Sequence, residues 1–142
     1  MCCQTTDQQN TIQAELIEIT ENLHRNDLTA SERDEHIAVW IRLTDKNRTR
    51  AFSLQNETKR GRPESGVRAA ARELGVESVE AHRATKVASL SDDAKRVARE
   101  VGLDDNRSAL QEAAKQHEPA KQADTLRKIH DAGNVTASKA KC

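Results

Sequence analysis

Large apolar side chains are scarce in this chain. Of its 142 residues one is tryptophan, one is phenylalanine and none is tyrosine. Leucine, isoleucine, valine and phenylalanine together account for 25 residues, whereas alanine alone accounts for 20. Alanine is the strongest helix former, and strands favour β-branched and aromatic residues. The composition therefore predicts an all-α fold of several thin helices, and neither a large β-barrel nor a doubly wound α/β enzyme.

Several function classes lack their sequence signals. No run of residues approaches the roughly 18 apolar positions of a membrane span, and the N-terminus has no apolar signal-peptide core. Cys2, Cys3 and Cys142 do not have the spacing of a disulfide framework, so we expect a cytoplasmic protein without membrane contact. The five histidines have no metal-ligand spacing, and no nucleophile motif is recognisable. We therefore expect no metal site and no enzymatic activity.

The net charge is zero, but charges of opposite sign are separated along the chain. Residues 1–45 carry nine acidic and three basic residues, and residues 46–72 carry two acidic and eight basic ones. Residues 73–142 carry twelve of each. A basic stretch beside helices is typical of nucleic-acid-binding proteins, and it is equally compatible with a solvated loop.

Apolar spacing and capping residues divide the chain into segments. Thr29 and Glu32 form a capping box at the start of one helix. Ser91 is expected to cap a later helix that ends just before Gly102, and Asp104 or Asp105 is expected to cap the helix after that one. We predict a disordered tail over 1–11 and then two helices within 12–44, the second of which ends near Thr44. A basic loop over 45–65 and a helix-turn-helix domain over 66–116 are expected to follow. The last segment, 117–142, is predicted to be a C-terminal helix that gives way to a flexible tail from Gly133 onward.

The helix-turn-helix prediction rests on one spacing. Ala71 is followed four positions later by Gly75 and then by Val76, while Ala81 and Ala84 fall on one face of the next helix. A helix-turn-helix needs a small residue where its helices cross, a glycine with positive φ in the turn, and apolar contacts that hold the angle. An ordinary helical hairpin has the same short pattern and remains the alternative.

The second helix of this motif would present a polar face to DNA. An arginine there can pair with guanine in the major groove, and serine or histidine can bond to base edges or phosphate. The residues predicted to face outward are Glu77, Ser78, His82, Arg83 and Lys86. The residues predicted to bind phosphate are Arg60, Arg62, Arg68 and Arg72. Lys59–Pro63 also resembles the core of a minor-groove A·T hook, or is simply the connection to the next helix.

Three segments, in family order, resemble the ParB family of partition and DNA-binding proteins. They are Glu21–Leu28, which is similar to the family pattern E-N-x-x-R-x-x-L, then Gly61–Gly75, and then Lys86–Leu90 followed by Gly102–Asn106. The resemblance covers about residues 12–116. It implies a helix-turn-helix that binds double-stranded DNA in plasmid or chromosome partition or in transcription regulation, and an association with the nucleoid or a plasmid.

The family also has an N-terminal sulfiredoxin-like domain that holds a cytidine nucleotide, and we expect most of that domain to be missing here. By resemblance, Glu21 and Asn22 would lie near the magnesium and triphosphate of CTP, and Arg25 near the phosphates. The alternative, which we favour, is that Glu21 and Arg25 form an ordinary i,i+4 ion pair of a helix, with no cofactor bound.

Two hypotheses follow from these observations. The first is sequence-specific binding of double-stranded DNA through the helix-turn-helix. The second is a helical interaction module that binds a ParB-like partner protein through a stripe left exposed at Leu16, Ile19 and Leu23. A homodimer is compatible with either.

Overall fold

The computed structural model describes residues 3–25, 27–54 and 66–139, and within these ranges the chain is entirely helical, without strands. The all-α prediction is therefore confirmed. The described helices are α1 (Cys3–Leu23), α2 (Ala30–Leu54), α3 (Val67–Leu74), α4 (Ser78–Ala88), α5 (Asp92–Glu100), α6 (Arg107–Ala113) and α7 (Pro119–Lys139).

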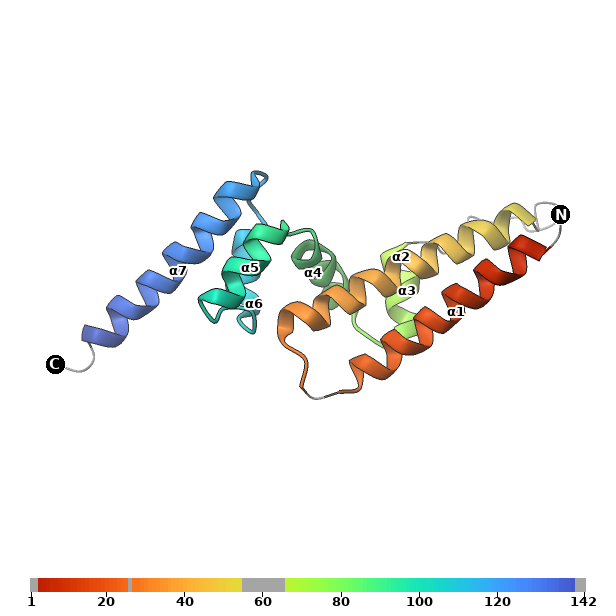
Figure 1. The fold of residues 1–142 in the computed structure, drawn as a ribbon, viewed down its shortest axis with the longest axis horizontal. Helices are drawn as coiled ribbons and strands as arrows, with labels where there is room; N and C mark the ends of the chain where they lie inside the picture. Colours follow the sequence, from red (N-terminus) through yellow and green to blue (C-terminus); the bar gives the residue numbers. More distant parts are fainter. Residues whose placement is uncertain (1–2, 26, 55–65, 140–142) are drawn as a thin grey trace.

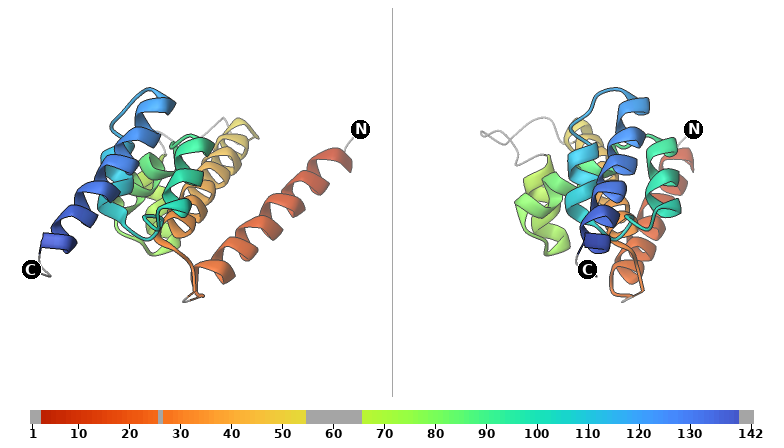
Figure 2. Two further views of the ribbon diagram at one scale, coloured as in Figure 1. Left: turned by 60° about the vertical axis from the view of Figure 1, so that its left-hand side comes forward. Right: turned by 90° about the vertical axis from the view of Figure 1, so that its left-hand side faces the viewer.

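The helices form an elongated molecule with the two chain ends at opposite extremes (Figure 1). Helices α1, α2 and α3 make up one end, α5, α6 and α7 make up the other, and α4 lies between them. The left view of Figure 2 shows the same order from a further side, with α1 and α7 on opposite sides of the central helices. Helix α4 therefore packs against elements of both ends.

Three groups of buried residues form the core, and alanine supplies many of them because thin helices can approach closely. The group around α2, α3 and α4 consists of Ile37, Ile41, Ala70, Ala71, Ala81 and Ala84. The group that runs from α4 to α7 includes Val87, Leu90, Ala94, Val97, Ala98, Leu110 and Leu126. The smallest group, Leu16, Ile19 and Leu43, joins α1 to α2.

The start of α2 is capped by residues near and far in the sequence. The amide of Thr29 donates to Oε2 of Glu32 (3.0 Å), and the amide of Glu32 donates to Oγ1 of Thr29 (3.3 Å), so the predicted capping box is confirmed. The next free amide, on Ala30, donates to Oδ1 of Asp105 (3.1 Å), and the amide of Ser31 donates to the carbonyl oxygen of Asp104 (3.0 Å). The loop between α5 and α6 thus closes the end of a helix some seventy positions earlier in the chain.

This arrangement corrects one predicted cap. Neither Asp104 nor Asp105 caps α6: Asp105 directs its carboxylate, and Asp104 its backbone carbonyl, to the start of α2. Asn106 does so instead, and its side-chain oxygen accepts a hydrogen bond of 3.1 Å from the amide of Ala109. The caps predicted at Ser91 and Gly102 for α5 are confirmed, with Ser91 Oγ accepting from the amide of Ala94 and Gly102 at φ 71°.

Three predicted boundaries were wrong. Residues 3–11 belong to α1 instead of a disordered tail, residues 45–54 continue α2 past Thr44, and α7 continues past Gly133 to Lys139. Extending a formed helix costs far less than starting one, and neither 3–23 nor 30–54 contains a glycine or proline that would end it. The remaining part of the predicted loop, residues 55–65, lies outside the described residues.

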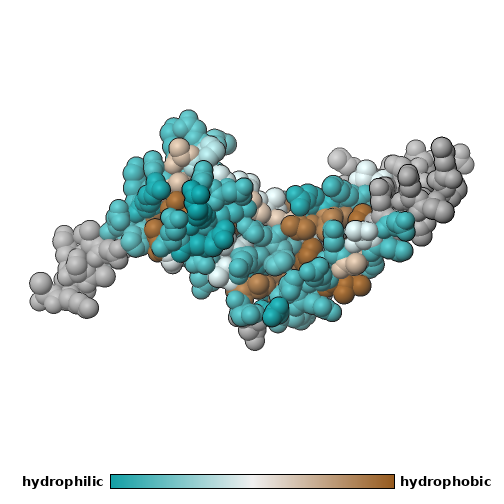
Figure 3. Space-filling model, in the orientation of Figure 1, coloured by the Kyte–Doolittle hydropathy of each residue, from teal (hydrophilic) through white to brown (hydrophobic). Residues whose placement is uncertain are grey.

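Hydrophilic residues cover most of the face drawn in Figure 3, and the apolar residues visible there concentrate over the end formed by α1, α2 and α3. Among the described helices, none combines the length and the apolar character that crossing a bilayer requires.

Candidate nucleic-acid interface

Helices α3 and α4 are separate elements joined by a tight turn. Gly75 ends α3 with φ 78° and ψ 21°, the left-handed conformation that glycine adopts without strain. The amide of Gly75 donates to the carbonyl of Arg72 (3.3 Å), and the amide of Val76 donates to that of Ala71 (3.0 Å). This pair of bonds is a Schellman motif, which closes the helix end and redirects the chain into α4. The positive φ predicted at Gly75 is confirmed.

The inner face of α4 is made almost entirely of small residues. Ala81, Ala84 and Val87 are each 0% exposed, and Ala71 on α3 is 1% exposed. The methyl side chains of the three alanines let the helix axes come close, as the A-x-x-x-G-V spacing predicts. Ala71, Ala81 and Ala84, predicted to lie at the contact between the two helices, are therefore in the core, and Val76 packs against them while half-buried.

The outer face of α4 carries the residues predicted to meet DNA. His82, Arg83 and Lys86 are exposed, and Ser78 at the start of the helix is half-buried. Arg83 and Lys86 form no ion pair with any residue that the structure describes. The same face also exposes Val79, which sequence reasoning did not single out.

The structure describes two of the four residues predicted to bind phosphate. Arg68 and Arg72, both exposed, lie on α3 next to α4. Arg48 on α2 forms an ion pair with Glu73, so α2 and α3 are also joined by charge. Arg60 and Arg62, and with them the proposed A·T hook at Lys59–Pro63, lie outside the described residues.

A charge network holds α4 against its neighbours. Oε1 of Glu80 on α4 lies 3.8 Å from Nε of Arg33 on α2 and 3.7 Å from Nη2 of Arg107 on α6. Arg107 in turn donates a 2.9 Å hydrogen bond to Oδ1 of Asp34, whose side chain is completely buried. The network neutralises the acid in the first turn of α4 and leaves the outer face of that helix with its cations.

The carboxyl group of Asp34 lies in an environment that disfavours its charged form. Burial raises the pKa of Asp34 above its ordinary value, and the Arg107 guanidinium opposes that shift without cancelling it. Its Oδ2 atom has no hydrogen-bond partner among the described residues. Sequence analysis missed this residue, although it has a signal: Asp34, Ile37 and Ile41 share one face of α2, and an acid on an apolar stripe is unusual.

The residues assigned to a nucleotide by resemblance lie at the end of α1 and in the turn after it. Glu21 and Arg25 are exposed, and Asn22 is half-buried. Helix α1 ends at Leu23, so the predicted i,i+4 pair of Glu21 with Arg25 was also wrong; Nε of Arg25 lies 3.7 Å from Oδ1 of Asp27 instead.

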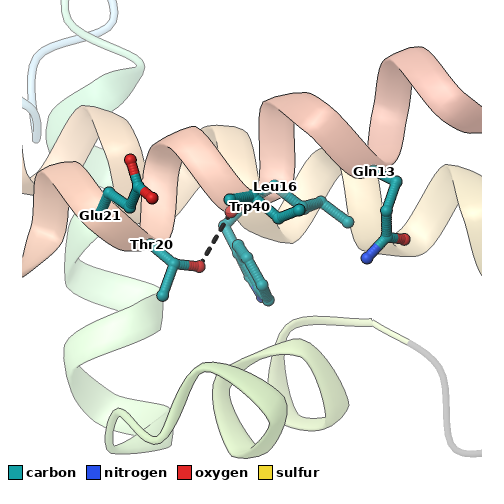
Figure 4. A pocket seen from close by; sticks show the side chains of 6 residues that line it. Gln13, Leu16, Thr20, Glu21 and Trp40 are labelled. Atoms are coloured by element: carbon teal, nitrogen blue, oxygen red, sulfur yellow. Dashed lines mark hydrogen bonds between the residues drawn. The ribbon is translucent and has the colours of Figure 1, made fainter.

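A pocket of about 220 Å³ lies beside Glu21, between α1 and the indole of Trp40 (Figure 4). It is lined by Gln13, Leu16, Ile17, Thr20, Glu21 and Trp40. A triphosphate needs positive charge around it, and these six side chains supply none. The pocket therefore does not fit the nucleotide that the resemblance implies.

The face predicted to dock a partner protein is already occupied. Leu16 and Ile19 are 8% and 6% exposed and pack with Leu43 of α2, and Leu23 is half-buried against the same helix. The prediction that these residues form an exposed stripe was wrong, because α2 packs along α1 through Val39, Trp40 and Leu43. Ile17, on the adjacent face, is the exposed residue.

In the described part of the chain, no three histidine, cysteine, aspartate or glutamate side chains are placed to hold a metal ion. No family model matches the chain, and no curated protein or solved structure matches it significantly. The resemblance to the ParB family therefore stays a prediction from the segments quoted above.

Proposed function

We propose that this chain binds double-stranded DNA sequence-specifically, with α3 and the turn after it as the support and α4 as the helix that enters the major groove. The observation that carries the proposal is the division of α4 into two faces. Ala81 and Ala84 are completely buried, while His82, Arg83 and Lys86 are exposed on the opposite side. A helix that is anchored by one face and cationic on the other has the form that groove reading needs.

Charge supports the same proposal. An exposed cation without a protein partner is available to a phosphate or a base edge, and Arg83 and Lys86 have no such partner in the described ranges. Arg68 on α3 is a further exposed cation beside them. Arginine presents a planar fork that matches the O6 and N7 acceptors of guanine, so we assign base reading to Arg83 and phosphate binding to Lys86 and Arg68.

The ParB resemblance adds biological roles to this proposal, namely partition or transcription regulation. These roles share the same first step, which is the recognition of one DNA site. That step is the one to test.

The test begins with purified full-length protein and fragmented genomic DNA. Retained fragments are sequenced to give a common site, and affinities for that site and for unrelated DNA are then measured by fluorescence anisotropy. We expect one enriched site. Arg83→Ala should lose about 1–3 kcal/mol of the discrimination between the site and unrelated DNA.

The matched control is Arg99→Ala. Arg99 is also an exposed arginine without an ion pair among the described residues, but it lies on α5. Its substitution should leave discrimination unchanged. No enriched fragment, or an equal loss in both variants, would refute the proposal, and retention of a protein instead of DNA would favour the interaction module.

A further inference from the structure

Val79 is an apolar side chain in a place where the fold does not use it. It is 55% exposed, and in the described ranges Ile17 (53%) is the other large apolar residue with comparable exposure. Val79 belongs to none of the three groups of core residues. The core of the fold therefore does not account for this side chain.

The position of Val79 on α4 is specific. It lies one turn before Arg83 and two turns before Lys86, and residues at spacings of four and seven share one face of a helix. The alanines at 81 and 84 lie on the opposite side and are 0% exposed. An apolar side chain therefore lies in the first turn of the exposed face, in line with two cations that have no partner among the residues that the structure describes.

This combination matches one feature of the major groove. Each base presents hydrogen-bonding atoms on its major-groove edge, and thymine presents an apolar 5-methyl group beside its O4 acceptor. In helix-turn-helix docking the N-terminal residues of the second helix approach the base edges, and Val79 is the second residue of α4. Valine also has a stiff side chain, so little conformational freedom is lost when it packs against a methyl group.

We propose that Val79 is a specificity-determining residue that packs against the 5-methyl group of a thymine in the site that α4 reads. The inference rests on the proposed function. Four residues of helix span about 6 Å, and stacked base pairs are about 3.4 Å apart. The thymine therefore lies one or two base pairs from the guanine read by Arg83.

The acids near Val79 do not oppose this placement. The Glu80 carboxylate is turned toward Arg33 and Arg107, at 3.8 Å and 3.7 Å, and is half-buried. Glu77 precedes the helix and is exposed, where it is a candidate acceptor for a cytosine amino group. The cations at 83 and 86 favour a polyanion over an apolar protein surface as the partner of this face.

The experiment removes the 5-methyl group of thymine without changing any hydrogen-bonding atom of the base. In the selected duplex each thymine is replaced in turn by deoxyuridine, which lacks only the 5-methyl group. Affinities are measured for the full-length wild-type protein and for Val79→Ala. At one position deoxyuridine should weaken wild-type binding roughly threefold to fivefold, the effect of one buried methyl group. Val79→Ala should bind both duplexes equally.

Ile17→Ala is the matched control, since Ile17 has the same exposure but lies on α1. It should respond to deoxyuridine as the wild type does. Alanine is a better helix former than valine, so Val79→Ala is expected to fold, and circular dichroism checks this.

The outcomes separate this inference from the proposed function. If the wild-type protein selects no DNA, both fail. If it selects a site but no position shows a response that Val79→Ala loses, or the site has no thymine within two base pairs of the Arg83-dependent guanine, this inference alone is overturned and DNA reading by α4 stands.

Discussion

Arg107, the first residue of α6, donates a 2.9 Å hydrogen bond to the completely buried carboxylate of Asp34, near the start of α2. The two residues are 73 positions apart in the sequence. Through Glu80 the same guanidinium also contacts α4. One arginine therefore ties the proposed DNA-reading helix to both ends of the molecule.

Removing the Asp34 side chain should destabilise the protein. Asp34→Ala leaves the Arg107 charge without its closest partner and opens a small cavity. Arg107 keeps Glu80 at 3.7 Å and is 33% exposed, so we expect a loss of about 1–3 kcal/mol in the free energy of unfolding, less than for a fully buried pair. Urea unfolding measures it. Asp34→Asn, which keeps the shape and an acceptor for Arg107, should cost less.

The raised pKa of Asp34 predicts a specific pH dependence. Because the folded chain holds this proton more tightly than the unfolded chain, stability from Asp34 is complete below the ordinary aspartate pKa and is lost as pH rises through the raised pKa of the folded state. The free energy of unfolding of the wild type should therefore fall relative to Asp34→Asn across that window and then stay level. If the difference in unfolding free energy between the two proteins does not change with pH, or changes in the opposite direction, the Arg107 charge outweighs burial in setting the pKa of Asp34.

Gly75→Ala should weaken both the fold and DNA binding. A Cβ at this position would meet no atom within 4 Å, so the whole effect comes from the backbone at φ 78°. An alanine in this conformation costs roughly 1–2 kcal/mol, measurable by thermal unfolding. Gly133→Ala is the control: this glycine lies within α7 and also has open space, and substitution should stabilise the helix by up to about 1 kcal/mol. Equal effects at both positions would contradict the turn geometry.

Ala84→Leu should disturb the packing of α4 on α2 and α3. Ala84 is 0% exposed in the group that includes Ile37 and Ala71, and three added carbon atoms do not fit between helices held together by methyl groups. Overpacking of this kind typically costs 1–3 kcal/mol. Ala120→Leu adds the same atoms at an exposed position of α7 and should change the free energy of unfolding by less than about 0.5 kcal/mol. Urea unfolding of both variants provides the comparison.

Lys86→Ala should change the salt dependence of DNA binding more than its specificity. A lysine on a phosphate releases about one counterion on binding, so the slope of log K against log salt should fall in magnitude by roughly 1. Affinity should drop by a similar factor for the selected site and for unrelated DNA. Lys128→Ala, at an exposed lysine on α7, should leave the slope as it is. An unchanged slope in Lys86→Ala would remove this residue from the phosphate contacts.

Local sequence patterns predicted much of the secondary structure. The capping box at Thr29 and Glu32, the cap at Ser91 and the turn at Gly75 are each defined by residues within five positions of one another, and all three are confirmed. The ends of α1 and α2 were not predictable in this way. No glycine or proline stops either helix where apolar spacing ends, and polar residues continue a helix once it exists.

The candidate interface was also predictable in part from local sequence patterns. Ala81 and Ala84 mark the inner face of α4, and the exposure of Arg83 and Lys86 then follows from helical periodicity. Val79 was missed because a valine next to alanines reads equally well as a core residue. Only the packing of α4 on its neighbours shows that it is exposed.

By itself the sequence determined that the chain is helical, where most helices begin, and which face of α4 carries charge, because these depend on interactions between residues at most a few positions apart. The tertiary structure alone decided that α2 covers Leu16 and Ile19, and that Asp105 caps a helix 75 positions away. It also decided that Asp34 is buried against Arg107. Each of these is a contact between segments far apart in the chain, whose free energy appears only when the helices pack and water is excluded from between them.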